Sequence, residues 1–572
     1  MTIRALGKLI SGNATKIEGR ASLGHSLLVC LCLFVCWTSI RAVDFGEHYD
    51  ESHPILEPIQ LAAQTGVLLP RNYQYPSFCF DLGLVGLIPD LLKTYLFHSQ
   101  PRDPSVYLSQ VLGDSAYILR MRSIVILLSL ISMICLYVAI YRWRRNWVEA
   151  LLASAIYGLS WETAYHSRFF TADSPMTQFG SLVIMFLIFA VTTERPSRYL
   201  QFAAIGAGLA TGCKYPAALF IFPVLIAAFQ VRNRLMQSVE MVFAKLCILF
   251  VVAYLCTTPG TVLDPIEFWR WVIWQWNIYA GGHGGFTVAA GPHHLYLMIC
   301  YFALALFSRF SPIAVFFFLF SLFGAYSLMT RDRDKAFLIL TFPVLYLYLF
   351  SMQQVMIVRN LIVLAPLFAL CAARGLVDAY DRLRFPALKW SMPILVIMAL
   401  FSNGAWLLYA SETIRNRQSD DYIAELSEYL SQHPSQSFSL SPNVRDTLIF
   451  REGSIPPNAT ADPADKSAFF VFFDTDIPKE VYEHWRPNHF DFVYKCFGPL
   501  NINLNYYDPY LVQDTRIIIL RGQDAAAIGV LPSARTDSSN GAGPNPPVAN
   551  VPAAKGAAPP AGSNLNARGT GG

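Results

Sequence analysis

The amino-acid sequence predicts an all-α polytopic membrane protein, and its composition is the first observation behind this prediction. Of the 572 residues, 54% are hydrophobic and only 14% are charged, and the mean hydropathy is +0.39. Soluble domains carry about a quarter charged residues, so most of this chain is suited to a lipid solvent. The formal net charge of +4 and the lack of a basic stripe with interleaved aromatic residues exclude a nucleic-acid-binding protein.

The second observation is a series of long apolar stretches. A spanning helix needs about 20 predominantly apolar residues, and its backbone must satisfy its own hydrogen bonds inside the bilayer. The stretches predict about eleven spans, at 22–40, 121–141, 147–165, 175–193, 199–213, 215–231, 245–259, 309–329, 336–352, 360–374 and 390–410. The first follows several basic residues and lacks a convincing cleavage site, which predicts an uncleaved signal anchor. The stretch 293–308 is either an interfacial helix or a further span.

The third observation is the distribution of basic residues between these stretches. Short cytoplasmic loops carry an excess of Lys and Arg. If the N-terminal segment 1–21 is cytoplasmic, the alternation places every basic-rich loop on the same side, namely 142–146, 194–198, 232–245, 331–335 and 374–389. Two long segments then lie outside the cell: a large first outer loop, 41–120, and everything that follows residue 410. Eleven spans give a more consistent charge pattern than ten or twelve.

The chain after the multi-span region 22–410 has a different composition. Within 411–525, a polar helix is expected at 420–432 and strands at 468–473, 490–494 and 516–520, which predicts a small extracytoplasmic α/β domain. The segment 526–572 is rich in Pro, Ala, Gly, Ser and Asn. Such a segment contains too few apolar residues to offset the entropy of ordering, and it is predicted to be a disordered tail.

The first outer loop contains the candidate site. Four carboxylates, Asp44, Glu47, Asp50 and Glu51, lie within eight residues. Pro54 is suited to the first position of a helix that runs to Thr65 and ends at Gly66. The acids would then lie at the N-terminal end of this helix, where the helix dipole stabilises negative charge.

Two interpretations of these acids remain open. An ionised carboxylate at the mouth of a membrane cavity can serve as a general base. Alternatively, the acids merely cap a surface helix, since such residues favour helix starts. Adjacent residues on a helix do not face the same way, so Asp50 and Glu51 are expected to have different roles: one acts on substrate and the other supports the structure.

The same loop resembles a known family. Asp50-Glu51 is followed by Gly66-Val-Leu-Leu-Pro70 and then by Tyr75-Pro76-Ser77. This order is similar to the first outer loop of GT-C glycosyltransferases that use lipid-phosphate-linked sugars. Within that class, the chain resembles the family 39-like enzymes, namely bacterial relatives of protein O-mannosyltransferases and of lipid A aminoarabinose transferases.

Further motifs follow in the order of that family and extend the resemblance over about 40–380. They are Arg120-Met-Arg-Ser123, Ser167 to Asp173, Gly208 to Tyr215, Thr258-Pro259 with Leu263-Asp264-Pro265, and Arg359-Asn360 followed by Pro366. Two departures narrow the resemblance. Tyr75-Pro76 replaces the Lys-Pro of the lipid A enzymes, which argues against that acceptor. The paired-Trp and Asp-Tyr-Gly signature of oligosaccharyltransferases is absent, which argues against transfer of a whole oligosaccharide.

The resemblance implies that an acceptor hydroxyl attacks the anomeric carbon of a single sugar bonded to polyprenyl phosphate, at the outer face of the membrane. It implies Asp50 as the general base, Glu51 as a supporting residue and Asp173 as a third catalytic candidate, because charges near the hydrocarbon are costly and usually functional. Cations must balance charge on the leaving phosphate. The candidate substrate-binding residues are Arg120, Arg168, Lys214, His283 and Arg359.

The implied partners are a polyprenyl-phosphate-linked sugar, membrane lipid, and a protein or a lipid or glycan acceptor. No metal-binding motif is present and no cofactor is required, although paired acids would allow a divalent metal. Two other functions remain open. A transporter or lipid flippase would be expected to show internal repeats and polar groups near mid-span, and neither is evident. A catalytically inactive scaffold is disfavoured because Asp50, Asp173 and Arg359 are all present.

Overall fold

The computed structural model describes residues 18–43, 49–97, 108, 111–112, 115–283, 286–417, 422–441, 444–445, 448, 455–460, 469–473, 491–494 and 515–521. The chain divides into two compact units. One comprises Met1–Tyr429 with Asp491–Ile517, and the other comprises Leu430–Phe490 with Ile518–Gly572. The predicted tail 526–572 and the cytoplasmic segment 1–17 lie outside the described residues, as do Asp44 and Glu47.

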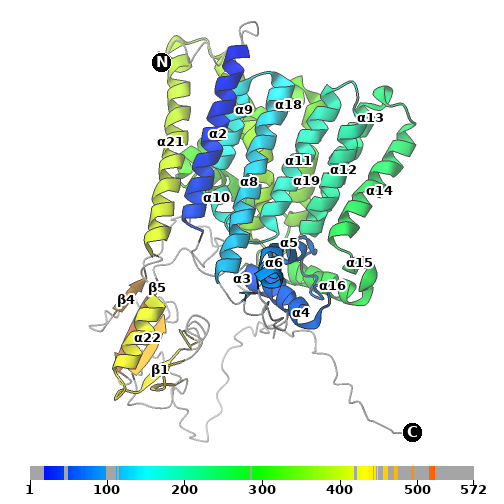
Figure 1. Cartoon of the computed structure of the whole chain (residues 1–572). Coiled ribbons are helices and arrows are strands. Elements are labelled where there is room, and N and C mark those ends of the chain that lie inside the picture. Colours follow the sequence, from blue (N-terminus) through cyan, green and yellow to red (C-terminus); the bar gives the residue numbers. More distant parts are fainter. Residues whose placement is uncertain are drawn as a thin grey trace, which may run out of the picture. The chain divides into compact units, whose positions relative to one another are not determined.

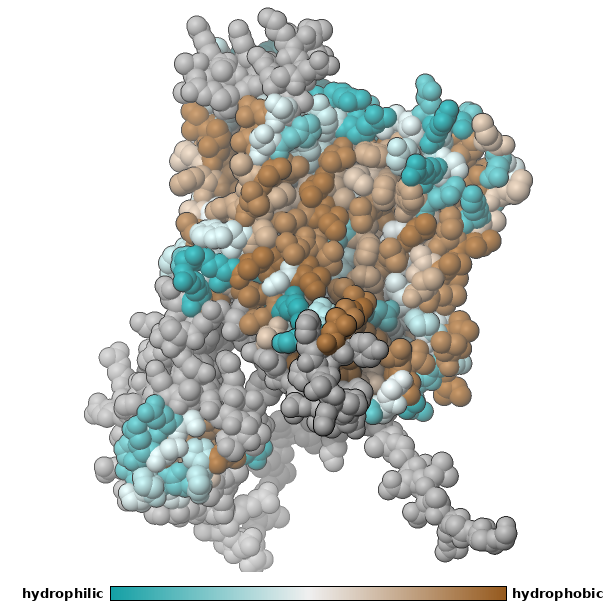
Figure 2. All heavy atoms as spheres, viewed as in Figure 1, coloured by the Kyte–Doolittle hydropathy of each residue, from teal (hydrophilic) through white to brown (hydrophobic). Residues whose placement is uncertain are grey.

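The first unit is a bundle of long helices (Figure 1). Its long elements are α2 (Glu18–Arg41), α8 (Ser115–Arg144), α11 (Asp173–Thr192), α12 (Ser197–Cys213), α14 (Val239–Thr257), α18 (Ser311–Arg331), α19 (Arg333–Ser351), α20 (Ala365–Arg382) and α21 (Pro386–Arg417). Shorter members are α9 (Trp147–Gly158), α10 (Trp161–His166), α13 (Ile221–Gln230) and α17 (Pro292–Tyr301). A band of apolar side chains crosses the visible face of this bundle (Figure 2).

Eight helices of the described chain are long and apolar enough to cross a membrane. Each coincides with one of the predicted spans, so the prediction of an all-α polytopic membrane protein is confirmed. The remaining predicted spans coincide with shorter helices: α9 with α10, α12, and a 3-10 turn (Tyr215–Phe220) leading into α13. The ambiguous stretch 293–308 forms α17 and a π-helical turn (Phe302–Leu306). A total of eleven spans stays a prediction.

One end of the bundle is capped by the described part of the first outer loop. Its helices are α3 (Tyr49–Glu51), α4 (Glu57–Thr65), α5 (Phe78–Gly86) and α6 (Ile88–Phe97). They lie beside α15 (Gly260–Leu263) and α16 (Pro265–Gly281) (Figure 1). Ile55, Ile59, Phe80, Met121 and Phe170 belong to a hydrophobic cluster that fixes this layer on the bundle.

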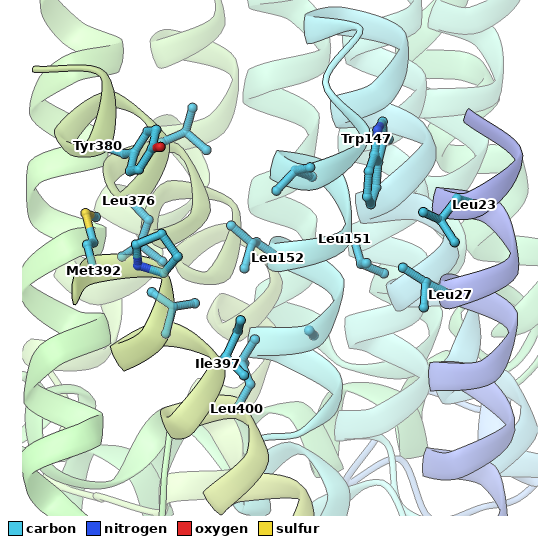
Figure 3. Close-up of a pocket in the computed structure, with 15 residues that line it drawn as sticks. Leu23, Leu27, Trp147, Leu151, Leu152, Leu376, Tyr380, Met392, Ile397 and Leu400 are labelled. Carbon is cyan, nitrogen blue, oxygen red and sulfur yellow. The ribbon is translucent and has the colours of Figure 1, made fainter. Parts of the chain in front are cut away.

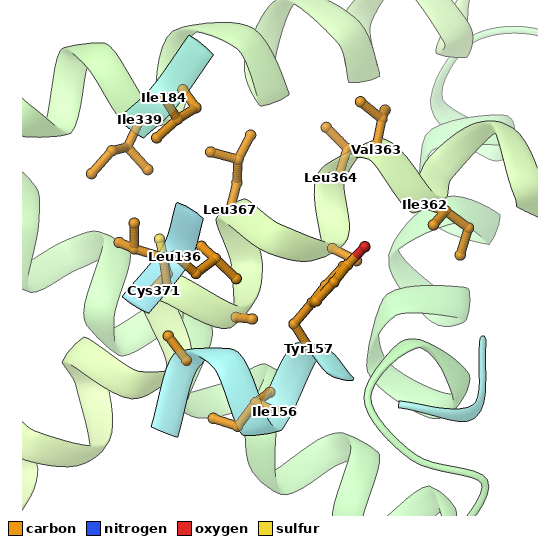
Figure 4. Packing of buried hydrophobic residues seen from close by; sticks show 14 of the residues in the cluster. Leu136, Ile156, Tyr157, Ile184, Ile339, Ile362, Val363, Leu364, Leu367 and Cys371 are labelled. Carbon is orange, nitrogen blue, oxygen red and sulfur yellow. The ribbon is translucent and has the colours of Figure 1, made fainter. Parts of the chain in front are cut away.

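The bundle core is built from aliphatic side chains with a few aromatic ones, some of which are drawn in Figure 4. Small residues let two helices approach closely. A Cβ atom added at Gly324 on α18 would lie 1.8 Å from the Cys371 carbonyl oxygen on α20, and one at Gly375 would lie 2.0 Å from the Phe320 carbonyl oxygen. Backbone contact through small residues is a common way to pack helices in membranes, where burial of apolar surface from water gives no driving force.

A buried charge cluster, here called the Arg374 cluster, lies at the other end of the bundle. The Arg374 guanidinium is 3.1 Å from an oxygen of Asp378, 3.5 Å from one of Asp332 and 3.9 Å from one of Glu149. Arg144 contacts Glu149 at 3.4 Å. These residues come from α8, α9, the α18–α19 turn and α20, so the cluster ties the ends of these segments together.

A cavity of about 420 Å³ in the bundle is apolar. Leu23, Leu27, Trp147, Leu152 and Leu400 are among its lining residues, which come from α2, α9, α20 and α21 (Figure 3). None of its lining residues is a predicted site residue. Such a surface is suited to a lipid acyl chain and offers no group for chemistry.

The second unit contains strands β1 (Phe438–Leu440), β2 (Ala459–Thr460) and β3 (Phe469–Phe473), with β1 parallel to both of the others. Helix α22 (Tyr422–Gln432) precedes β1, and β4 (Asp491–Tyr494) and β5 (Thr515–Arg521) follow β3. Elements therefore occur where the sequence predicts a helix and strands within 411–525. The domain boundaries stay predictions.

Candidate active site

The two adjacent acids of the first outer loop belong to the first turn of a helix. The helix begins at Tyr49 as α3, widens into a π-helical turn over Ser52–Leu56, and continues as α4 to its left-handed cap at Gly66 (φ 71°). The predicted end at Gly66 is confirmed, but the predicted start at Pro54 is wrong. Pro54 lacks the N–H that would bond to the carbonyl four residues earlier. The helix therefore widens into a π-helical turn at this residue and does not start there.

Asp50 lies inside the protein with only 3% of its surface exposed. One of its carboxylate oxygens, Oδ2, forms an ion pair with the Arg359 guanidinium and accepts a hydrogen bond of 3.0 Å from the Tyr75 hydroxyl. Burial and the neighbouring carboxylate raise the pKa of Tyr75 well above its ordinary value. The Tyr75 hydroxyl therefore keeps its proton and acts as a donor to Asp50.

Asp173, the first residue of α11, lies beside Asp50 in the same cluster. Its carboxylate is 2.6 Å from the Lys214 ammonium and 3.6 Å from Nε of Arg359. Lys214 also donates a 2.6 Å hydrogen bond to the side-chain oxygen of Asn360. Lys214 follows the end of α12 in an extended conformation, and Arg359 and Asn360 lie in a 3-10 helix, Val358–Leu364.

Four residues predicted separately are therefore neighbours: Asp50, Asp173, Lys214 and Arg359, here called the Asp50 cluster. Three of the four are almost fully buried, with exposures of 3%, 1% and 4% for Asp50, Asp173 and Lys214. Burying charged groups is costly unless they are paired. The chain brings them together from four distant segments, which indicates a site with a chemical role.

Glu51 faces away from Asp50, as the helical spacing predicts. Its two oxygens bind the Arg122 guanidinium through a pair of hydrogen bonds, at 2.9 Å from Nε and 2.5 Å from Nη2. It also accepts a 2.6 Å hydrogen bond from the backbone N–H of Phe170. Glu51 thus joins the first outer loop to α8 and to the segment before α11. This geometry gives it a supporting position and no access to substrate.

The structure does not bring the other predicted binding residues to the Asp50 cluster. Arg120 forms an ion pair of 2.5 Å with Asp90. Arg168 is fully buried, with its guanidinium 5.4 Å from the Trp161 ring centroid and a 3.4 Å hydrogen bond to Ser411. Burial lowers the pKa of Arg168 to about 10, so it stays charged at neutral pH. His283 is exposed at the turn that follows α16.

A cavity of about 240 Å³ lies next to the Asp50 cluster. Lys214 belongs to both the cluster and the cavity wall, and Tyr75, which donates to Asp50, also lines the cavity. Trp276, Tyr279 and Phe350 contribute aromatic surface to the wall. Tyr279 also accepts a 3.1 Å hydrogen bond from the Asn360 side chain. The cavity therefore has one charged end and an otherwise mostly apolar lining, which suits a ligand with an anionic head and an apolar chain.

Sequence reasoning missed three residues that organise the site. Tyr75 and Asn360 are quoted in the motifs but receive no role there, and Arg122 lies in the same motif as Arg120. Their positions in the sequence could have revealed them: Asn360 directly follows Arg359, Arg122 lies two residues after Arg120, and Tyr75 belongs to a motif of the first outer loop. Within the described part of the chain, no group of three His, Cys, Asp or Glu side chains is placed to hold a metal ion.

Comparison with known proteins gives one match to a family model. Residues 108–257 match the model described as dolichyl-phosphate-mannose-protein mannosyltransferase. The matched stretch contains Asp173 and Lys214 but neither Asp50 nor Arg359. A search of curated proteins finds no match to this chain.

Solved structures give distant likenesses. ArnT from Cupriavidus metallidurans bound to undecaprenyl phosphate is 13% identical, with 86% of this chain and 97% of that chain covered and a TM-score of 0.45. The archaeal oligosaccharyltransferase AglB from Archaeoglobus fulgidus is 10% identical, with 74% and 63% covered and a TM-score of 0.43.

The sequence resemblance and the family match agree in two respects. Both concern membrane enzymes that handle lipid-linked sugars, and both include the segment that supplies Asp173 and Lys214 to the buried site. The described chain is also a multi-pass helical bundle, as that class requires. The chain is therefore a multi-pass membrane glycosyltransferase, and its residues 108–257 are similar to the protein mannosyltransferases that this model describes.

Proposed function

We propose that the chain transfers a single sugar from a polyprenyl-phosphate carrier to a hydroxyl group of an acceptor at the outer face of the membrane, with Asp50 as the general base. The observation that carries this proposal is the position of Asp50. Its carboxylate lies in a buried cluster with two cations, Arg359 and Lys214, and that cluster adjoins a largely apolar cavity.

The reaction requires three groups to act together. The acceptor oxygen forms a bond to the anomeric carbon while Asp50 takes the hydroxyl proton. The bond between the anomeric carbon and the phosphate oxygen breaks, and its electron pair leaves with the phosphate. Cations near that oxygen stabilise the charge that develops there. Arg359 and Lys214 are the cations of the cluster, and a guanidinium can bind phosphate through two parallel hydrogen bonds.

The proposal also assigns the remaining groups. Asp173 holds Lys214 in place at 2.6 Å, and Glu51 fixes the loop that carries Asp50 through Arg122. The polyprenyl chain lies in the cavity beside Trp276 and Phe350. No divalent metal is needed, because Arg359 and Lys214 supply the positive charge. The basic loops favour a cytoplasmic N-terminus, which places the Asp50 cluster at the extracytoplasmic face.

Replacement of the base tests the proposal. Membrane vesicles that contain the protein and the acceptors of its source cell are given radiolabelled polyprenyl-phosphate-mannose, the donor class that the matching family names. Asp50→Asn is expected to lower label transfer by about 10²–10⁴-fold, the usual contribution of a general base. Yield and membrane insertion should stay unchanged, because Asn preserves the size of the side chain.

Asp90→Asn serves as the matched control, since Asp90 also pairs with an arginine, Arg120, but lies outside the cluster. This variant should transfer label at the wild-type rate. Full activity of Asp50→Asn would remove the base assignment. Uptake of labelled lipid or sugar across the membrane without transfer would identify a transporter or flippase instead. Wild-type protein that binds no polyprenyl phosphate would contradict the proposal as a whole.

A further inference from the structure

Every charge in the Asp50 cluster is already paired with another member of the cluster. Arg359 contacts both Asp50 and Asp173, and Lys214 contacts Asp173. Two acidic and two basic groups give the cluster a formal charge of zero. The proposed function requires these same cations to bind the donor phosphate. An incoming phosphate therefore adds negative charge to a site whose cations are already neutralised.

The two cations differ in how firmly they are held. Lys214 is 4% exposed and is held by two acceptors, Asp173 and Asn360, each at 2.6 Å. Arg359 retains 12% exposure of its side chain, and its contact to Asp173 is longer, at 3.6 Å. A guanidinium also carries five donors in a planar fork, so it can bind a new anion while keeping one older contact. Arg359 is the cation that can exchange partners.

We infer that the donor phosphate takes Arg359 away from Asp50, and that this exchange makes Asp50 available as a base only when the donor is bound. This inference rests on the proposed function. In the structure, Oδ2 of Asp50 is occupied by Arg359 and by the Tyr75 hydroxyl. When Arg359 turns to the phosphate, Oδ2 of Asp50 loses that contact and can accept a hydrogen bond from the acceptor hydroxyl.

The exchange also explains why a buried carboxylate next to an apolar cavity is paired with a guanidinium in the structure. An uncompensated charge in such a site is costly, and the ion pair with Arg359 offsets that cost. The donor then supplies a replacement anion for Arg359, so no cation is left unpaired. The binding order that follows is donor first and acceptor second.

Binding of undecaprenyl phosphate at pH 8, where its phosphate is ionised, tests this exchange. Its affinity is measured for the full-length purified protein in detergent, for Asp50→Asn, for Arg359→Gln and for the double variant. If Asp50 competes with the phosphate for Arg359, Asp50→Asn should bind about tenfold more tightly than wild type, equivalent to ~1.4 kcal/mol. Arg359→Gln should bind more weakly, and Asp50→Asn should give no gain in the Arg359→Gln background.

Asp90→Asn is the control, since it removes an Arg-paired carboxylate elsewhere and should leave the affinity unchanged. Asp50→Ser replaces Asp50→Asn if the latter does not fold. Unchanged or weaker binding by Asp50→Asn, with normal wild-type binding, overturns the exchange and leaves the proposed function standing. A gain that persists without Arg359 shows general charge repulsion and overturns the exchange as well. No binding by the wild type overturns the proposed function itself.

Discussion

The adjacent residues Asp50 and Glu51 have different contacts because the helix directs their side chains to different sides. Asp50 faces the cluster that contains Arg359, whereas Glu51 binds Arg122 and the Phe170 backbone. Successive helical residues point about 100° apart, so one short turn supplies both the proposed base and the residue that supports it. From the sequence, the role of either residue alone would be ambiguous. Because the two residues are adjacent on a helix, they must face different neighbours and therefore have different roles.

Glu51→Gln should destabilise the protein more than a comparable change at a partly exposed ion pair. Both Glu51 and Arg122 are 2% exposed, and breaking a buried pair by removing one partner costs about 3–5 kcal/mol. Asp90→Asn, which breaks a partly exposed pair with Arg120, should cost about 1 kcal/mol or less. Thermal unfolding in detergent measures both. Equal midpoints for the two variants would contradict the supporting role of Glu51.

Most of the Asp50 cluster could be predicted from the sequence, since charged residues at the ends of apolar runs are unusual in a membrane protein. What the sequence could not decide is which neighbour points inward. Arg120 and Arg122 are two residues apart on α8, and residues at that spacing do not face each other. The phase of α8 is set by its packing against α11 and α9, so only the structure assigns Arg122 to the site layer.

At the scale of elements, the lengths of the apolar stretches predicted where the helices lie, but they did not predict where a helix is interrupted. The predicted span 147–165 is two helices, α9 and α10, separated at Leu159 and Ser160. The Ser160 side chain accepts a hydrogen bond from the Thr163 N–H and donates one of 2.5 Å to the Leu306 carbonyl. The second contact lies 146 residues away in the sequence, and no local pattern reveals it.

The close contact between α18 and α20 leads to a prediction at this scale. Gly324→Ala and Gly375→Ala should both destabilise the bundle, because the added methyl group would overlap backbone atoms at 1.8 and 2.0 Å. Overpacking of this kind costs typically 1–3 kcal/mol. Gly404→Ala on α21 is the control, since its nearest neighbour would be Phe34 at an ordinary 3.8 Å. Differential scanning fluorimetry ranks the three variants; a Gly404→Ala loss equal to the others would reject the packing account.

At the scale of the whole molecule, the orientation predicted from the basic loops can be tested directly. Green fluorescent protein fused after Arg234 should fluoresce, because that loop is expected on the cytoplasmic side, and alkaline phosphatase fused after His433 should be active outside. The reciprocal fusions should be silent. The opposite pattern would place the Asp50 cluster on the cytoplasmic side and would require a cytoplasmic acceptor.

The Asp50 cluster contains Asp173, at the start of α11, whereas the Arg374 cluster contacts Glu149 and through it Arg144, at the end of α8. Between them, the sequence of α8 from Ser123 to Tyr141 contains no Asp, Glu, Lys or Arg. The stretch from Leu361 to Ala373, in the 3-10 helix and the first part of α20, contains none either. One of the hydroxyls in the first stretch, Ser132, accepts a 2.9 Å hydrogen bond from Ser181 on the neighbouring helix α11. Along these two stretches of the described chain, no charged side chain therefore lies between the two clusters, and a charge that moved from one cluster to the other would have to cross closely packed apolar groups.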